Sequence, residues 1–265
     1  MEHEPILRLT LFLSVFVLMA LWEVFNPRRP LTQSKSRRWF SNISLVIINT
    51  IVLRLLFPTA TLGAALYAQE QNWGIFNISA TPAIIATVLS ILLLDLLIYW
   101  QHRLVHVVPL FWRFHRVHHV DPDLDITSGS RFHPVEILFS MLIKVTAILL
   151  LGVPPIAALI FEAILSSMAM FNHSNVNIPE RLDRWLRVLL VTPDMHRVHH
   201  SVEWRETNSN YGFNLSWWDR LFASYKPSPD SGQLAMILGV KGISNPRTTT
   251  NLIGMLFLPF QKNPQ

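Results

Sequence analysis

The sequence predicts an all-α integral membrane protein, a helical bundle with about four to five transmembrane or re-entrant helices. Of the 265 residues, 51% are hydrophobic and 15% are charged, whereas soluble proteins carry about 25% charged residues. The apolar residues are also concentrated in long uncharged runs, which a bilayer requires and a soluble core does not. These two observations exclude an ordinary water-soluble fold.

The first apolar run, residues 6–25, has the length of one transmembrane helix, about 20 residues. A cleaved signal peptide is not expected there, because the acidic Glu2 and Glu4 precede the run and no small-residue cleavage site follows it. The second run, residues 43–68, is expected to break near Pro58, since proline interrupts a helix.

The third run, residues 82–100, carries one acid, Asp95, near its end. The longest apolar stretch, residues 135–171, is interrupted by a Gly-Val-Pro-Pro segment at 152–155. This segment predicts two short helices joined by a tight turn. Each half has only about 16 or 17 residues, so these helices are expected to be tilted or to cross the bilayer only in part.

Charge in the loops predicts the orientation. The loop between the first two runs has five basic residues and no acid: Arg28, Arg29, Lys35, Arg37 and Arg38. The loop at 69–81 has Glu70 and no base. The positive-inside rule then places the first loop in the cytoplasm and the N-terminus outside. The same rule puts the polar segments that follow the third and last runs on the cytoplasmic face.

We expect a single membrane domain in three parts. Residues 1–82 form N-terminal transmembrane helices, residues 83–225 form a catalytic region, and residues 226–265 form an interfacial tail. Short interfacial helices are expected in the polar stretches, with tryptophans in the headgroup belt: Trp100, Trp112, Trp185, Trp204, Trp217 and Trp218. The 22 Lys and Arg against 17 Asp and Glu indicate orientation and anionic lipid rather than a nucleic-acid partner.

Histidine carries the chemical signal, because ten of the 11 histidines lie between His102 and His200. Eight form three clusters, two of which are the same pentapeptide, HRVHH: His102 and His106; His115, His118 and His119; His196, His199 and His200. Spacings of three and four place imidazoles on one helix face, where they can converge on a metal. The chain has no Cys, so any metal is held by nitrogen or oxygen.

Eight imidazoles exceed the ligand number of one ion, which is about four. Adding His133 and His173 suits two ions with four or five nitrogens each, although a solitary histidine is more often a hydrogen-bonded structural residue. His3 is expected to be solvated. Imidazole suits iron, zinc, copper and nickel alike, and the HExxH motif of a zinc hydrolase does not occur.

The motifs follow the order Asp95…Tyr99-Trp-Gln-His102-Arg-Leu-Val-His106, His115-Arg-Val-His118-His119, Asn172-His173-Ser-Asn175, Pro193-Asp-Met-His196-Arg-Val-His199-His200 and Asn210-Tyr211-Gly212. Over about residues 83–225 this order resembles the fatty acid hydroxylase and sterol desaturase superfamily of membrane di-iron oxygenases. One departure is Phe222-Ala-Ser-Tyr225, where relatives often have Phe-Gly-Thr-Tyr.

The resemblance implies a cytoplasmic helical cap that holds two Fe ions. It also implies an enzyme that uses O2 and two electrons to hydroxylate or desaturate a lipid such as a fatty acyl chain or a sterol. A separate electron donor protein is implied, because no haem domain is appended. Nine residues match the metal ligands of the family: His102, His106, His115, His118, His119, His173, His196, His199 and His200; His133 is a further candidate.

Carboxylates are expected around the ligands, fixing imidazole tautomers through the second ring nitrogen. Asp95 lies seven residues before His102, on the same helix face. Glu136, Asp194 and Asn172 are the other candidates, with helix capping as the alternative role for the asparagine. 

Other charged residues have simpler expected roles. The acids at 121, 123 and 125 are expected to lie in a solvated loop. Lys144 and Glu162 are expected to pair or to line a cavity; extension of Lys144 to the interface is the alternative. The arginines of the two HRVHH segments are expected to meet an acidic headgroup, a donor protein or lipid phosphate.

Two questions stay open at the level of sequence. Hydroxylation is favoured over desaturation, but both reactions use the same kind of site. The alternative from another class is a non-redox zinc-binding membrane protein, either a hydrolase or a metal-handling protein. A bacterial inner membrane is favoured over the endoplasmic reticulum, because the chain is short and has no retention signal.

Overall fold

The computed structural model describes residues 4–57 and 59–262, and the regular elements in these ranges are helices, with only isolated β-bridges besides. The longer helices are α1 (Glu4–Phe25), α2 (Lys35–Leu56), α3 (Ala60–Glu70), α5 (Ala83–Val107), α6 (Pro109–His119), α7 (Pro134–Leu151) and α8 (Pro155–His173). The short ones are α4 (Ile75–Ile78), α9 (Glu180–Leu186), α10 (Pro193–His199), α11 (Trp204–Thr207), α12 (Trp217–Leu221), α13 (Pro246–Thr249) and α14 (Leu252–Phe257).

Five helical stretches are long and apolar enough to cross a membrane: 6–25, 35–78, 83–107, 134–151 and 155–173. Apolar side chains on these helices face outward, as Ile84 does with 80% of its surface exposed. Such exposure is costly in water and favourable in hydrocarbon. The predicted all-α integral membrane bundle is therefore confirmed.

The predicted helix breaks are also confirmed. Helix α2 ends at Leu56 and α3 begins at Ala60, and Pro58 itself lies outside the described residues, as does His3. Helix α5 continues without interruption from the third apolar run to Val107. Gly152 ends α7 with a φ of +69°, a left-handed conformation that glycine adopts without steric cost.

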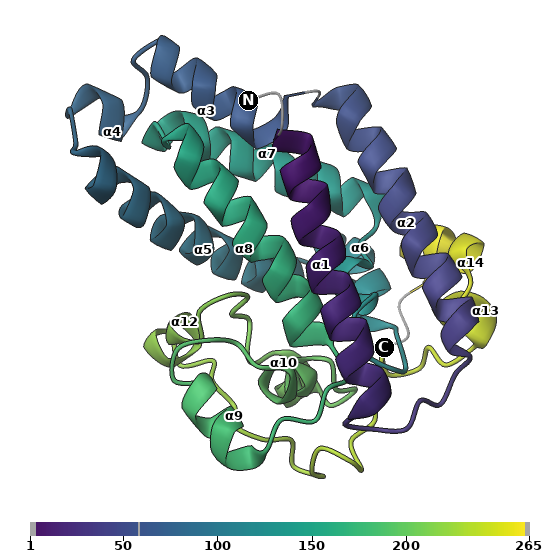
Figure 1. Cartoon of the computed structure of the whole chain (residues 1–265). Coiled ribbons are helices and arrows are strands. Elements are labelled where there is room, and N and C mark those ends of the chain that lie inside the picture. Colours follow the sequence, from purple (N-terminus) through teal and green to yellow (C-terminus); the bar gives the residue numbers. More distant parts are fainter. Residues whose placement is uncertain (1–3, 58, 263–265) are drawn as a thin grey trace.

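The long helices direct the polar parts of the chain to one end of the molecule (Figure 1). The C-terminal ends of α1 and α8 lie at this end, together with the N-terminal end of α2 and the short helices α9, α10 and α12; we call this end the cap. Helices α3 and α4 lie at the opposite end. The basic loop between α1 and α2 is therefore on the same side as the cap.

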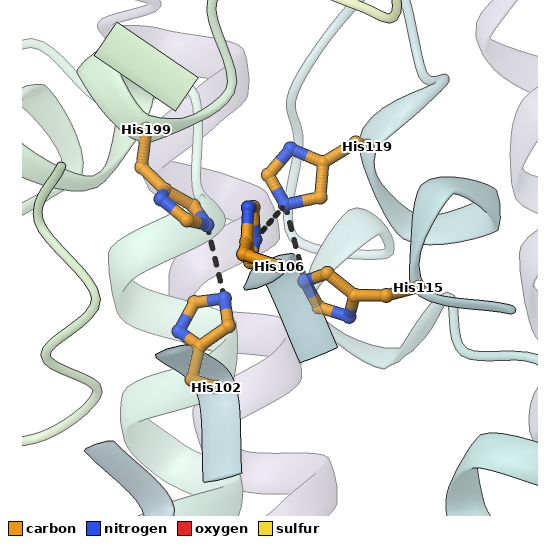
Figure 2. A group of neighbouring side chains, drawn as sticks. All are labelled: His102, His106, His115, His119 and His199. Carbon is orange, nitrogen blue, oxygen red and sulfur yellow. Dashed lines mark hydrogen bonds between the residues drawn. The ribbon is translucent and has the colours of Figure 1, made fainter. Parts of the chain in front are cut away.

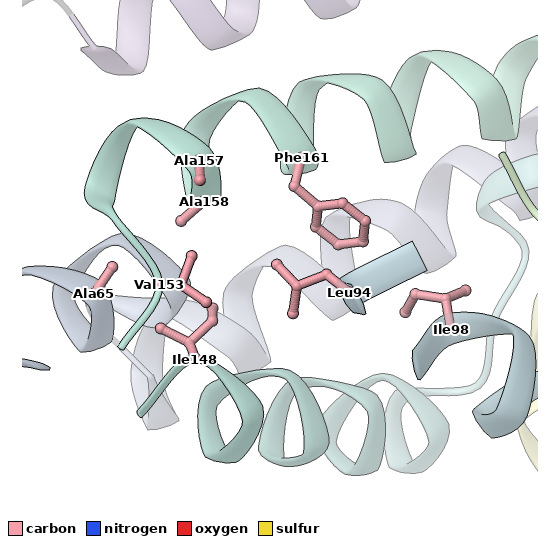
Figure 3. Close-up of a cluster of buried hydrophobic side chains, with 8 residues drawn as sticks. All are labelled: Ala65, Leu94, Ile98, Ile148, Val153, Ala157, Ala158 and Phe161. Carbon is pink, nitrogen blue, oxygen red and sulfur yellow. The ribbon is translucent and has the colours of Figure 1, made fainter. Parts of the chain in front are cut away.

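The opposite half of the bundle packs around one apolar cluster, shown in Figure 3: Ala65, Leu94, Ile98, Ile148, Val153, Ala157, Ala158 and Phe161. It joins α3, α5, α7 and α8. Ala157 and Ala158 are fully buried, and small side chains of this kind allow neighbouring membrane helices to approach closely. This packing fixes α5 and α8, whose cap ends carry histidines.

The expectation of a solvated acidic loop is wrong. Asp121, Asp123 and Asp125 are all buried, with at most 5% of their surface exposed. The reason is Arg38, which donates from Nε to Asp121 Oδ1 at 2.8 Å and from Nη1 to Asp125 Oδ2 at 2.6 Å. Burial alone would raise the pKa of Asp121, but Arg38 and then Arg131 outweigh it and hold that pKa below its usual value.

Replacing Arg38 should destabilise the fold strongly. In Arg38→Met, Asp121 and Asp125 keep their burial and lose their main counter-charge, and breaking a buried ion pair costs about 3–5 kcal/mol. The matched control is Arg37→Met, because Arg37 is exposed. Thermal unfolding of the two purified variants should show a large drop in melting temperature for Arg38→Met only. Equal melting temperatures of the two variants would contradict the structure.

Candidate metal centre

Nine histidines converge in the cap in two adjacent groups. The first group contains His102, His106, His115, His119 and His199, and the second contains His118, His173, His196 and His200. Within each group the candidate ligand nitrogens all lie within 4.8 Å of one another. Figure 2 shows the first group, with imidazoles from three helices pointing toward one another. All eight cluster histidines and His173 are therefore brought together.

Helix spacing explains how each HRVHH segment serves both groups. On α6, His115 and His119 are one turn apart and enter the first group, while His118 enters the second. At α10 the assignment is reversed, because His196 and His200 enter the second group and His199 enters the first. The i and i+4 residues share one face and the i+3 residue lies beside it. The duplicated pentapeptide thus links the two groups from both sides.

The tautomers of two imidazoles follow from their carbonyl partners. His102 Nδ1 lies 2.8 Å from the carbonyl oxygen of Tyr211, and His199 Nδ1 lies 2.7 Å from that of Ser209. A carbonyl oxygen can only accept a hydrogen bond, so each Nδ1 carries the proton and each Nε2 carries a lone pair. These two Nε2 atoms lie 2.9 Å apart (Figure 2). Facing lone pairs repel unless a cation lies between or beside them.

The second group follows the same rule. His173 Nδ1 donates to the carbonyl oxygen of Ala169 at 2.8 Å, which leaves its Nε2 unprotonated. That Nε2 lies 3.0 Å from Nε2 of His118 and 2.9 Å from Nε2 of His196. Both groups therefore fit a metal ion, because imidazole nitrogens converge in each group and at least one Nε2 in each carries a lone pair.

Burial keeps the imidazoles in the neutral form that binds metal. The histidines of α6 and α10 are buried. Burial is the largest cause, and repulsion from neighbouring imidazoles the second, that lowers the pKa values of His118 and His196 well below the usual 6.5. Burial likewise lowers the pKa of His199 to about 3. A neutral imidazole is the ligating form, so the site needs little proton release to take up a cation.

Glu136 is the carboxylate that contacts a candidate ligand. Its Oε1 accepts from Nδ1 of His115 at 2.6 Å, which directs Nε2 of His115 into the first group. With the carbonyls of Tyr211, Ser209 and Ala169, it orients four of the nine imidazoles.

The other predicted carboxylates contact other partners. Asp95 accepts from the indole Nε1 of Trp218 at 2.8 Å and from the backbone N–H of Leu215. Asp194 pairs with Arg28 and Arg197. These acids hold the cap in place rather than orienting an imidazole in this structure.

Two further predicted residues lie beside the site. Asn172 donates from Nδ2 to the carbonyl oxygen of Phe213 at 2.9 Å. His133 caps the start of α7, where its Nδ1 accepts from the backbone N–H of Val135, and it belongs to neither histidine group. In this structure His133 therefore acts as a helix cap.

The HRVHH arginines also differ from expectation. Arg116 donates to the carbonyl oxygens of Leu258 and Gln261, next to α14. Arg197 is buried, pairs with Asp194 within α10 and donates to the carbonyl oxygen of Ser174, just after α8, at 3.3 Å. Both arginines fasten segments of the cap to the histidine helices instead of facing lipid.

Sequence reasoning missed the backbone acceptors, since every residue carries a carbonyl. The turn that supplies Tyr211 is built by Asn210, whose φ of +51° is in the left-handed region, which asparagine tolerates. Asp219 accepts from the N–H groups of Tyr211 and Gly212 and holds that turn, and burial raises the pKa of Asp219 to about 6. Ala223, where relatives often have glycine, has a φ of +56°.

A cavity of about 380 Å³ adjoins both histidine groups. It touches His102 and His115 of the first group and His118 of the second, and it extends between α2, α5, α7 and α8 as far as Lys144 and Glu162. Most of its lining residues lie on membrane-length helices. A molecule in this cavity would lie directly beside the candidate metal ligands.

Comparison with known proteins now identifies the family. The model of the fatty acid hydroxylase family matches residues 87–224, more than half of the chain. The chain belongs to the fatty acid hydroxylase family. The matched segment contains all nine converging histidines. No solved structure matches the chain.

Three similar curated proteins are named as hydroxylases or monooxygenases. An ornithine lipid hydroxylase, OlsE, from Rhizobium tropici is 27% identical over 95% of this chain and 75% of its own length. An alkylglycerol monooxygenase from Xenopus tropicalis is 29% identical over 54% of this chain, and this chain covers 31% of it. A cholesterol 25-hydroxylase from Rattus norvegicus is 25% identical over 55% of this chain and 48% of its own length. The protein is thus an oxidoreductase of the fatty acid hydroxylase family.

Removing the Glu136 carboxylate should weaken metal binding. Glu136→Ala frees the His115 ring, and loss of a carboxylate partner typically lowers metal affinity about 10- to 100-fold. Glu136→Gln retains an oxygen that can accept a hydrogen bond from Nδ1 of His115, so this variant should lose much less metal affinity. Iron content after dialysis against a chelator measures the effect, with the exposed Glu203→Ala as control. Full iron retention by Glu136→Ala would refute this role.

Proposed function

We propose that the protein is a membrane di-iron oxygenase that hydroxylates a lipid with O2 and two electrons from a separate donor protein. The observation that carries this proposal is the convergence of nine imidazoles in two groups, beside a cavity lined largely by membrane-length helices. Imidazole alone does not choose between iron and zinc. The hydroxylase and monooxygenase relatives favour iron, because a C–H bond is oxidised only with redox chemistry.

The protein groups have distinct tasks in this proposal. The nine histidines would hold two irons, which supply the O2 chemistry that no side chain performs. Glu136 and the carbonyls of Tyr211, Ser209 and Ala169 hold four rings in the ligating orientation. The cavity positions the lipid chain next to the imidazoles. In the balanced reaction one oxygen atom of O2 is inserted into a C–H bond of the lipid. The other oxygen atom takes up two electrons and two protons and leaves as water.

The relatives favour hydroxylation and a polar membrane lipid. The similarity to the ornithine lipid hydroxylase extends over 95% of this chain, whereas the animal monooxygenases match about half of it. We therefore place the substrate among bilayer lipids with an acyl chain. The bacterial source of that relative also supports a bacterial inner membrane.

Lipid mass spectrometry under heavy-isotope oxygen gas tests the reaction. Cells that express the wild type should contain a lipid with one labelled oxygen, and cells that express His199→Ala should lack it, because the first group loses a ligand. His133→Asn is the matched control, since asparagine can keep the α7 cap and His133 lies outside both groups. 

Each alternative reaction has its own signature in this experiment. Loss of two hydrogens without label would make the enzyme a desaturase. Purified wild type that holds zinc after iron-replete expression, with no change in any lipid, would establish the non-redox alternative. Two irons per chain together with the labelled lipid would support the proposal.

The cap should face the cytoplasm. Because the chain has no cysteine, single-cysteine variants report accessibility directly. Gln71→Cys, exposed at the α3 end, should react with a membrane-impermeant maleimide on intact bacterial spheroplasts. Asp230→Cys, on the cap and 78% exposed, should react only after lysis. The reverse pattern would place the active site on the outer face.

A further inference from the structure

A partly buried ion pair between α7 and α8 lines the cavity. Lys144 of α7 donates from Nζ to Oε1 of Glu162 of α8 at 2.9 Å, and the two side chains are 10% and 20% exposed. Both residues line the cavity that begins at the imidazoles. Lys144 therefore pairs across the cavity instead of extending to the interface.

The pair lies far from the metal ligands along both helices. Lys144 follows Glu136 by eight residues, and Glu162 precedes His173 by eleven. At about 1.5 Å per residue these separations are about 12 Å and about 16 Å. Ionised groups at such depth are costly and typically face a functional cavity. The cavity thus has the imidazoles at one end and an ion pair at the other.

The ion pair keeps hydrogen-bonding capacity for a ligand. Within the described part of the chain, Lys144 makes one hydrogen bond, so its ammonium retains donors, and Oε2 of Glu162 retains acceptor capacity. Ser140 and Ser166 lie one turn from the pair on α7 and α8, and both also line the cavity. This end of the cavity can therefore solvate a polar group that both donates and accepts.

We propose that the Lys144–Glu162 pair binds an uncharged hydroxyl or amide group of the substrate lipid, and that it thereby selects which carbon lies beside the imidazoles. The proposal rests on the proposed function only in taking the cavity ligand to be the substrate. A charged group is disfavoured, because it would leave a net charge buried between α7 and α8. A plain hydrocarbon is disfavoured too, because it offers the pair no hydrogen bond.

Ligand binding to the purified protein tests this proposal without requiring turnover. The probes are a long-chain primary amide and the n-alkane of equal length, with affinities taken from concentration-dependent shifts in melting temperature. Wild type should bind the amide about tenfold more tightly than the alkane, as expected for hydrogen bonds to charged groups. Lys144→Met/Glu162→Met should lose this preference. The pair-reversing Lys144→Glu/Glu162→Lys should keep it.

The control is Leu142→Met, a change on the outward face of α7 where Leu142 is 55% exposed, and it should keep the preference. Equal binding of both probes by wild type, or a preference that survives in the double methionine variant, would overturn the proposal. Replacing a buried ion pair by apolar side chains is often neutral for stability. Iron content is measured in parallel, so that failure of metal binding is distinguished from failure of this subsite.

If the double methionine variant does not fold, cross-linking of the wild type tests whether the amide binds beside the Lys144–Glu162 pair. An amide probe with a photoreactive group beside the amide should label α7 or α8 within one turn of Lys144 or Glu162. Labelling confined to the cap or to the outer surface of the bundle would overturn the proposal.

Discussion

The structure depends on one electrostatic constraint: neutral imidazoles whose lone pairs point at one another cannot stabilise themselves. The carbonyls of Tyr211 and Ser209 fix the protons of His102 and His199 on Nδ1, which turns their Nε2 atoms into facing acceptors at 2.9 Å. The surrounding fold must therefore hold these rings in place, and a cation must compensate them. Burial strengthens both requirements, because water is excluded from the site.

The fold uses buried ion pairs to hold the imidazole rings in place. The loop after α6 would move freely if its acids were solvated, but Arg38 of α2 binds Asp121 and Asp125 and fixes it to the bundle. Arg28, in the loop between α1 and α2, likewise binds Asp194 of α10. Each of these ion pairs joins a segment that carries or follows histidines to α2 or to the loop before it. The pairs therefore set the position of the candidate ligands more than they add net stability.

Sequence alone predicts the features that depend on local periodicity. Apolar run length gives the membrane helices, and the i, i+3 and i+4 spacing of HRVHH gives the converging imidazoles. Prediction from sequence fails where the partner of a residue is distant in the chain. Asp121 resembles a loop acid until Arg38, 83 residues earlier, is placed beside it, and Asp95 is aligned with His102 yet binds the Trp218 indole. Backbone acceptors such as Tyr211 have no sequence signal at all.

The two polar ends of the cavity differ in what could compensate their buried polar groups. The proposed metal binding would account for the imidazole end, since a cation would offset the converging lone pairs. The Lys144–Glu162 end has no such explanation, because an apolar pair of similar size would pack α7 against α8 without the desolvation cost of two charges. A membrane helix pair that retains this cost needs a compensating contact, and the cavity beside it is where such a contact can form. The proposed contact with a polar group of the substrate would supply it, and helix packing alone does not.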